Sequence, residues 1–385
     1  MLVGATPGAA DASHVKITTW IPGLNAPRGI TFDSRGDLYV AESGVAGTGP
    51  AGLTNTGKVT KYRHESRHAA WSTAFESLFV SEDPTQPADV LGPEGLSALG
   101  NSCRADEHKG AQSSARKHVR PSDCQVRLIT SESHDGIAAA TGGAVSTTQA
   151  GHLFRLNRAT GLAKDLSDVG DQNYKWTGDH VDLFPSDFPD SNPYGVLVVK
   201  DRHQRVRTFV ADAGANTISE VKRNGVLRVI SYIPNETVPP LRDATPTCIA
   251  QGPDGMLYVA TLDLVANFGS PTGGKSNVWR VNPNANFPTA PTLWATGLTT
   301  ATACTFDRSG NFWATEMFAP NATGAPGDVV RIPFRHPTHQ THIGLGQLPL
   351  PGGIAQGPDG VMYVTINSAN PTPGSGAVVK LRTRS

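Results

Sequence analysis

Arg28, Glu94 and Tyr194 carry the kinds of side chain that acid–base catalysis uses, and they occupy matching positions in an internal repeat. A carboxyl group such as that of Glu94 can accept or donate a proton when it lies within hydrogen-bond reach of a reacting atom. Arg28 and Tyr194 can hold a substrate beside it. The alternative is that Arg28 and Glu94 form an ion pair that serves only the structure.

Four further side chains are candidates for ligand binding. Thr247 and Thr302 occupy the same repeat position in two other copies, so they are expected on the same rim. Asn192 lies just before Tyr194, and His180 lies further upstream, before the strand that carries Tyr194. For His180, the alternative is an ordinary solvated loop.

Glu42, Asp212 and Glu316 end the second strand of alternate repeats, the first, third and fifth. Carboxylates that converge repel one another unless a cation, a proton or hydrogen bonds intervene. A site for Ca²⁺ or Mg²⁺ is the functional interpretation, because both ions prefer oxygen ligands. The alternative is that each carboxylate accepts backbone N–H bonds from its own loop.

The elements that must position these residues come from a repeated hairpin: a short apolar strand, a tight glycine turn and a second strand that ends in a polar residue. Repeats of this length are typical of propellers and solenoids. Four copies are clear and two are degenerate: they begin at residues 25–33, 245–250, 303–306 and 351–355, and at 92–96 and 192–195.

A third strand with alternating apolar residues follows each hairpin, as at 152–156 and 217–221, and no helical pattern of useful length is present. The sequence therefore predicts an all-β fold: a six-bladed β-propeller of four-stranded antiparallel blades over residues 13–385. Residues 14–20 lack a blade of their own and are predicted to close the ring as the outer strand of the last blade.

The chain has 385 residues, with 33 Lys plus Arg against 33 Asp plus Glu. This balance argues against binding to nucleic acid or a membrane surface, since both need a basic excess. Residues 1–12 read as the remainder of an export signal, or else as a disordered N-terminus. With the cysteines, this predicts a secreted or periplasmic protein.

The cysteines divide into two pairs. Cys103 and Cys124 flank a polar insert at 101–125 and are expected to form a disulfide that closes it, with a basic anion-binding lid as the functional interpretation and a solvated loop as the alternative. Cys248 and Cys304 fall on adjacent first strands at offset positions. Because of that offset, they are predicted to be buried thiols.

Read in order, these motifs resemble the ScyD/ScyE family of six-bladed propellers over nearly the whole chain, most specifically at residues 190–195 and 211–214. The resemblance implies the fold and little about activity. Gluconolactonase-type propellers resemble the chain only in fold. They place Glu, Asn and Asp metal ligands at the first-strand position, where this chain keeps only Glu94, so a lactonase of that design is not expected.

Two functions fit the sequence. The first is an exported enzyme of secondary or degradative metabolism that modifies a small molecule at the channel mouth, as a hydrolase, lyase or cyclase. The second is a non-catalytic propeller that binds a ligand or a protein, which the lack of any recognised catalytic signature favours. Both imply a small molecule or a protein as partner, and neither requires nucleic acid or a membrane.

Overall fold

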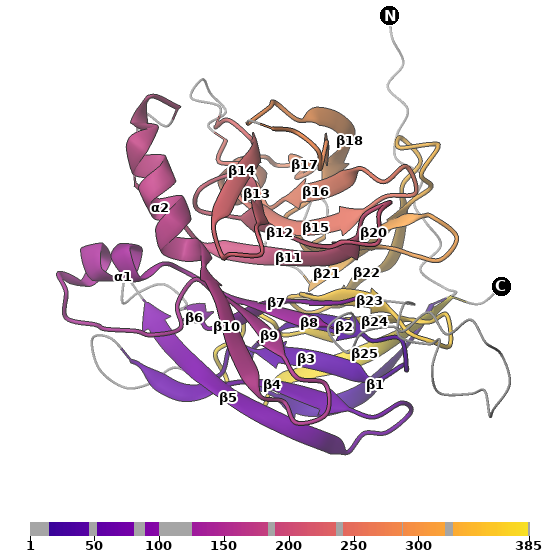
Figure 1. Cartoon of the computed structure of the whole chain (residues 1–385). Helices are drawn as coiled ribbons and strands as arrows, with labels where there is room; N and C mark the ends of the chain where they lie inside the picture. The colour runs from indigo at the N-terminus through magenta and orange to yellow at the C-terminus, as the bar shows by residue number, and fades with distance from the viewer. Residues whose placement is uncertain are drawn as a thin grey trace, which may run out of the picture.

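The structure is a computed structural model that describes residues 15–45, 52–80, 89–99, 125–183, 189–235, 242–286, 288–319 and 326–383. Its strands form six antiparallel sheets, five with four strands and one with five, which are the blades of a propeller (Figure 1). The prediction of an all-β, six-bladed propeller is confirmed. The N-terminal segment before residue 15 and most of the insert at 101–125, with Cys103 and Cys124, lie outside the described residues.

The first three blades cover the N-terminal half of the chain. Blade 1 contains β2 (Pro27–Phe32), β3 (Leu38–Glu42), β4 (Thr54–Tyr62), β5 (Ala69–Val80) and β6 (Asp89–Leu91). Blade 2 contains β7 (Pro93–Ala98), β8 (Val126–Thr130), β9 (His152–Leu156) and β10 (Ala163–Asp168). Blade 3 contains β11 (Pro193–Lys200), β12 (Val206–Asp212), β13 (Thr217–Val221) and β14 (Leu227–Tyr232).

The last three blades complete the ring. Blade 4 contains β15 (Pro246–Gln251), β16 (Leu257–Thr261), β17 (Ser276–Val281) and β18 (Thr292–Leu298). Blade 5 contains β19 (Ala301–Phe306), β20 (Phe312–Phe318), β21 (Pro326–Ile332) and β22 (Thr341–Leu348). Blade 6 contains β23 (Ile354–Gln356), β24 (Met362–Ile366) and β25 (Gly376–Thr383), and β1 (Val15–Leu24) is its outer strand.

The ring closes as the sequence predicts. β1 pairs antiparallel with β25, from Val15 opposite Thr383 to Leu24 opposite Gly376. A buried apolar layer lies between every two neighbouring blades, including the layer between blades 6 and 1 that contains Ile21 and Val40. The first and last blades therefore share a hydrophobic core, as neighbouring blades do elsewhere in the ring.

A carboxylate fixes the tight turn between the first two strands. In blade 1, Asp33 accepts hydrogen bonds from the backbone N–H groups of Arg35 and Asp37 and from the Tyr39 hydroxyl, at 2.8, 3.2 and 3.0 Å. Asp307 does the same in blade 5 with Trp313 as its aromatic donor. The repeated turn motif therefore joins the turn to the buried aromatic residue of the second strand.

Cys248 and Cys304 form a disulfide, with Cα atoms 5.6 Å apart, so the prediction of two buried thiols is wrong. The offset between their positions is what brings them together. The rim position is the first-strand position of Arg28 in blade 1 and of Glu94 in blade 2. Gly29, one residue after Arg28, packs on Leu96, two residues after Glu94: a Cβ added to Gly29 would lie 2.8 Å from the backbone of Leu96. Cys248 and Cys304 occupy this same pair of positions in blades 4 and 5.

In the part of the chain that the structure describes, three α-helices interrupt the strands, which the sequence does not predict: α1 (His134–Thr141), α2 (Val169–Asp179) and α3 (Leu264–Phe268). Figure 1 shows α1 and α2 at one edge of the ring, outside the sheets. The buried face of α2 consists of Val169, Gly170, Asn173 and Thr177, so it carries few of the apolar residues by which a helix is recognised in a sequence. Asp168 caps its first turn, since the side chain accepts from the N–H of Asp171 at 2.9 Å.

Candidate functional site

The six innermost strands enclose a cavity of about 480 Å³ along the axis of the ring. It is lined by one residue from the start of the first strand of each blade: Arg28, Glu94, Tyr194, Thr247, Thr302 and Gly352. The volume is in the range of small-molecule sites, which run from roughly 300 to 1,000 Å³.

Arg28, Glu94 and Tyr194 meet at one side of this cavity. They come from β2, β7 and β11, the first strands of three consecutive blades. The Nε atom of Arg28 lies 3.6 Å from Glu94 Oε1, and its Nη1 group donates to the Tyr194 hydroxyl at 3.4 Å. The structure therefore brings the three predicted catalytic residues together, and it also forms the ion pair that was the alternative for two of them.

The charged residues of the cavity wall lie on one side of it, in blades 1 and 2. Among the described residues that line it, Arg28 and Glu94 are the only charged ones, and their side chains are 4% and 2% exposed. The rest of the lining consists of glycine, apolar side chains and neutral polar groups. An ion pair with so little water around it interacts more strongly than one at the surface, because the effective dielectric constant is lower.

Ser43 belongs to this group and was missed by the sequence reasoning. It is fully buried and directly follows Glu42 at the end of β3. Its hydroxyl donates to the carbonyl oxygen of Pro93 at 3.1 Å and lies 3.5 Å from Glu94 Oε1, so it is in contact with the start of β7. Its position after a strand-end acid is the only signal of this contact in the sequence.

Thr247 and Thr302 line the cavity, but their hydroxyl groups face neighbouring blades. Thr247 donates to the carbonyl oxygen of Ala301 at 2.7 Å, and Thr302 donates to that of Pro351 at 2.8 Å. Both bonds join one innermost strand to the start of the next blade. The ligand-binding role predicted for these threonines therefore competes with a structural one.

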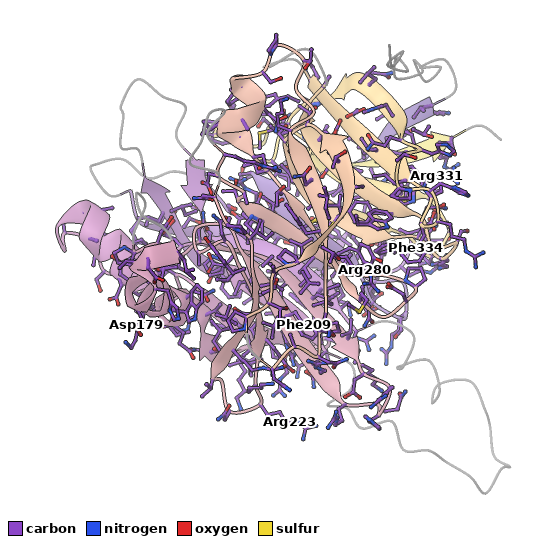
Figure 2. All side chains as sticks on the ribbon, turned by 90° about the horizontal axis from the view of Figure 1, so that it is seen from above. Asp179, Phe209, Arg223, Arg280, Arg331 and Phe334 are labelled. Carbon is purple, nitrogen blue, oxygen red and sulfur yellow. A yellow bond between two sulfur atoms is a disulfide. The ribbon has the colours of Figure 1, made fainter. Side chains whose placement is uncertain are left out.

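Asn192 and His180 lie outside the cavity lining. The side-chain oxygen of Asn192 accepts from the N–H of Glu132 at 3.1 Å, joining blade 3 to the loop before α1. His180 follows α2, stacks on Trp176 with ring centroids 4.3 Å apart and contacts the Trp176 carbonyl oxygen. Figure 2 shows the adjacent Asp179 at the edge of the molecule. His180 is absent from the residues that line the cavity, so the structure does not bring it to the channel.

The structure does not bring Glu42, Asp212 and Glu316 together. All three are fully buried, and each is held within its own blade. Glu42 accepts from the N–H of Asn25 at 2.8 Å, and burial raises its pKa. Within the described ranges, two groups of three His, Cys, Asp or Glu have ligand atoms within 4.8 Å of one another, and neither contains two members of this trio.

Asp212 is the best-satisfied member of the trio. One carboxylate oxygen accepts from the N–H groups of Asn192 and Ala215, and the other accepts from Ser191 Oγ and Asn173 Nδ2, all within 2.6–2.9 Å. Burial nevertheless raises its pKa. Its role in the structure is to fix the loops on both sides of β11 and β12, which agrees with the alternative that the sequence left open.

Glu316 has a different environment. It lies opposite Asp328 on β21, and His342 on β22 approaches both carboxylates, with Nδ1 2.7 Å from Asp328 and 3.6 Å from Glu316. One oxygen of Glu316 accepts from the N–H of Thr299 at 2.5 Å, and the other is buried with no hydrogen-bond donor. Burial and the neighbouring Asp328 raise the pKa of Glu316 well above its usual range.

Comparison with known proteins supports the fold. No protein-family model and no curated protein sequence matches the chain. A solved structure of a glucose-dehydrogenase-type oxidoreductase from Thermus thermophilus is 14% identical, covers 96% of this chain and 100% of its own, and has a TM-score of 0.50. A Bacteroides thetaiotaomicron protein of unknown function is 9% identical over 96% of this chain and 76% of its own, with a TM-score of 0.51.

A streptogramin B lyase is also similar, at 12% identity, 97% and 99% coverage and a TM-score of 0.47. At these identities the likeness shows the fold alone. The six-bladed fold implied by the resemblance to the ScyD/ScyE family is confirmed, and membership of that family stays a prediction.

Proposed function

We propose that the protein is an exported enzyme of secondary or degradative metabolism that modifies a small molecule at the channel mouth by acid–base chemistry, as a hydrolase, lyase or cyclase. The observation that carries the proposal is that Arg28 contacts both Glu94, at 3.6 Å, and Tyr194, at 3.4 Å, at one side of a cavity of about 480 Å³. Residues far apart in the chain are thereby gathered on the wall of one cavity.

Each residue has a role that its position supports. Glu94 takes a proton from the substrate, or from a water molecule that attacks it, and returns the proton to the leaving atom. Arg28 Nη1 and the Tyr194 hydroxyl already hydrogen-bond each other at 3.4 Å, so both can turn to a substrate oxygen and stabilise the charge that develops on it. The Ser43 hydroxyl lies 3.5 Å from the Glu94 carboxylate.

The charge distribution of the cavity indicates a neutral, largely apolar substrate. Arg28 already has a counter-ion in Glu94, so a second anion placed there would be repelled by the carboxylate in a poorly hydrated environment. A carbonyl, ester or lactone oxygen can accept from Arg28 and Tyr194 without that cost. The apolar lining would bind the rest of such a molecule.

Export is supported by the Cys248–Cys304 disulfide, because disulfides persist mainly in oxidising compartments. None of the helices in the described ranges has the length and apolar character needed to cross a bilayer. The glucose-dehydrogenase-type and lyase structures contribute the fold only. Glu42, Asp212 and Glu316 are held in separate blades, so the proposed chemistry does not use a Ca²⁺ or Mg²⁺ ion bound by that trio.

A specific observation favours a second function, a non-catalytic binding propeller. Arg28 and Glu94 already satisfy each other's charge while nearly fully buried, as a structural ion pair does. In this interpretation the cavity binds a ligand whose chemistry does not change. The two functions differ in what the Glu94 carboxylate contributes.

The test is Glu94→Gln, which keeps the size of the side chain and removes its basicity. Turnover of a panel of neutral esters, lactones and unsaturated ring compounds is followed by mass spectrometry, and binding of the same panel by equilibrium dialysis. Loss of general acid–base catalysis should lower turnover by about 10²–10⁴-fold while binding changes little. Binding without turnover in either form supports the binding propeller.

Glu220→Gln is the matched control. Glu220 is also a mostly buried carboxylate in an ion pair, 2.8 Å from Arg207 Nε, but it does not line the cavity. The control should lower stability without a comparable effect on turnover. Equal losses of turnover in the two variants, in step with their melting temperatures, would refute a catalytic role for Glu94.

A further inference from the structure

A second cluster of ligand-type side chains lies on blade 2, away from the channel. His134 is the first residue of α1, His152 the first residue of β9, and Asp168 ends β10 and caps α2. Asp168 Oδ2 lies 3.8 Å from His134 Nδ1 and 3.8 Å from His152 Nε2. One carboxylate oxygen therefore faces one nitrogen from each of two imidazole rings.

The remaining polar atoms of the cluster are engaged in ways that orient it. Nδ1 of His152 contacts Asp165 Oδ2 at 2.8 Å, which leaves Nε2 pointing toward Asp168. The other oxygen of Asp168 accepts from the N–H of Asp171 at 2.9 Å, which leaves Oδ2 for the histidines. A histidine that ligates a metal almost always has a carboxylate or carbonyl on its other ring nitrogen, as His152 has here.

The cluster is accessible and lies in an acidic environment. Its side chains are 14–34% exposed, so an ion can enter and keep a water molecule. Burial raises the pKa of the nearby Tyr174, and so does the negative charge of Asp135, Asp190, Asp171 and Glu132. The surroundings therefore favour a cation, and the acidic groups lie on both helices, in the loop before α1 and in the segment between α2 and β11.

We propose that His134, His152 and Asp168 bind one divalent transition-metal ion, of which Zn²⁺ suits this ligand set. Two imidazole nitrogens and one carboxylate oxygen are typical Zn²⁺ ligands, and three protein ligands leave one position open. Ligands about 2.1 Å from a tetrahedral ion lie roughly 3.4 Å apart. The two histidine nitrogens lie 3.8 Å from Asp168 Oδ2, and all three ligand atoms lie within 4.8 Å of one another, so the side chains need to move inward to bind an ion. The ion would join α1, β9 and the start of α2.

The alternative occupant is a proton. Hydrogen bonds to Asp168 and then Asp171 raise the pKa of His134 to about 10, so the same groups can form an ion-pair network without a metal. The other three-residue group, Glu316 with Asp328 and His342, is buried except for 16% of the His342 side chain. It provides the internal control, because it contains the same ligand types.

The experiment uses the full chain, freed of metal with a chelator and titrated with Zn²⁺ by calorimetry and with Co²⁺ by visible absorption at pH 7.5. One ion per chain is expected, with micromolar or tighter affinity and the absorption bands of a Co²⁺ ion with four ligands. His134→Gln and His152→Gln should each weaken binding at least about 30-fold. His342→Gln should leave it unchanged.

Asp165→Asn guards against variants that fail to fold, because Asp165 is 52% exposed and touches the site only through His152. Loss of such an orienting carboxylate typically weakens metal binding by about 10–100-fold. Absence of saturable binding below about 100 µM overturns the proposal. So does binding that survives in the His134 and His152 variants or that His342→Gln removes. None of these outcomes bears on turnover at the channel, so the proposal stands or falls independently of the proposed function.

Discussion

The two halves of the channel ring use the same repeat position differently. In blades 1–3 the rim residues are Arg28, Glu94 and Tyr194, which contact one another across the blades. In blades 4 and 5 they are Thr247 and Thr302, whose hydroxyl groups bond to backbone carbonyl oxygens of the next blade. One half of the ring therefore presents reactive groups, and the other half holds the inner strands together.

The contacts just below the rim differ between blades as well. In blades 1, 2, 3 and 6 a glycine after the rim residue packs on the next blade, as Gly95 does on Tyr194, where an added Cβ would lie 2.5 Å from the carbonyl oxygen. In blade 4 this position is Cys248, and the disulfide to Cys304 replaces the close backbone contact. A covalent bond thus fixes the half of the ring that has no charged residues at the rim.

Among variants in the two halves of the ring, loss of the disulfide should lower the unfolding free energy most. Replacing Cys248 and Cys304 together by alanine removes a link across 56 residues, which is worth about 4 kcal/mol of unfolding free energy in the chain-entropy account. Denaturant unfolding of the oxidised protein and the double variant measures it. A change below about 1 kcal/mol would mean that the hydrogen bonds of the threonines suffice to hold this half.

Arg28→Met tests the other half. The substitution leaves Glu94 buried without its counter-ion, and breaking a buried pair in this way costs about 3 kcal/mol at neutral pH. Adding Glu94→Gln should restore most of the loss, because the unpaired charge is then gone. The double-mutant cycle is measured by denaturant unfolding, and a single variant as stable as the parent protein contradicts a tight ion pair.

Much of this ring could be predicted from the sequence. The hairpin motifs align Arg28, Glu94 and Tyr194 correctly because blades are stacked repeats, so position in the repeat determines position around the axis. The ring closure by the N-terminal strand follows from the same logic. Contacts between blades are harder to predict, since they depend on the stagger of neighbouring strands. That stagger is why the offset of Cys248 and Cys304 was misinterpreted.

Side-chain partners and insertions could not be predicted either. A strand-end acid such as Asp212 gives no sign in the sequence of whether loop donors or other acids will surround it. His134 and His152 come together because α1 and α2 fold beside blade 2, and the buried positions of both helices carry few apolar side chains. Such contacts depend on loop conformation, which local periodicity does not encode.

Asp212 and Glu316 repeat the comparison at one equivalent position, the end of the second strand, in blades 3 and 5. Asp212→Asn places an NH₂ group where one carboxylate oxygen accepts from two donors. Leaving buried donors unsatisfied should lower the unfolding free energy by about 2 kcal/mol. Thermal and denaturant unfolding check this, and an unchanged midpoint would show that the loop donors find other acceptors.

Of these variants, Glu316→Gln should change the unfolding free energy least at acidic pH, and it should raise the unfolding free energy toward neutral pH. Burial and Asp328 raise the pKa of Glu316 in the folded state, so the folded protein holds a proton there that the unfolded chain releases. Between the unfolded and folded pKa values the folded state binds more protons, and stability therefore falls as pH rises. Glutamine cannot ionise, and its NH₂ group can donate to Asp328, so the variant should lose this slope and become the more stable form toward neutral pH.

Unfolding free energies of both proteins between pH 5 and pH 8 measure the difference, with Glu220→Gln as a control at a carboxylate whose pKa is lowered instead. Parallel pH profiles for Glu316→Gln and the parent protein would show that Glu316 is ionised when folded, with His342 and its other neighbours compensating the charge.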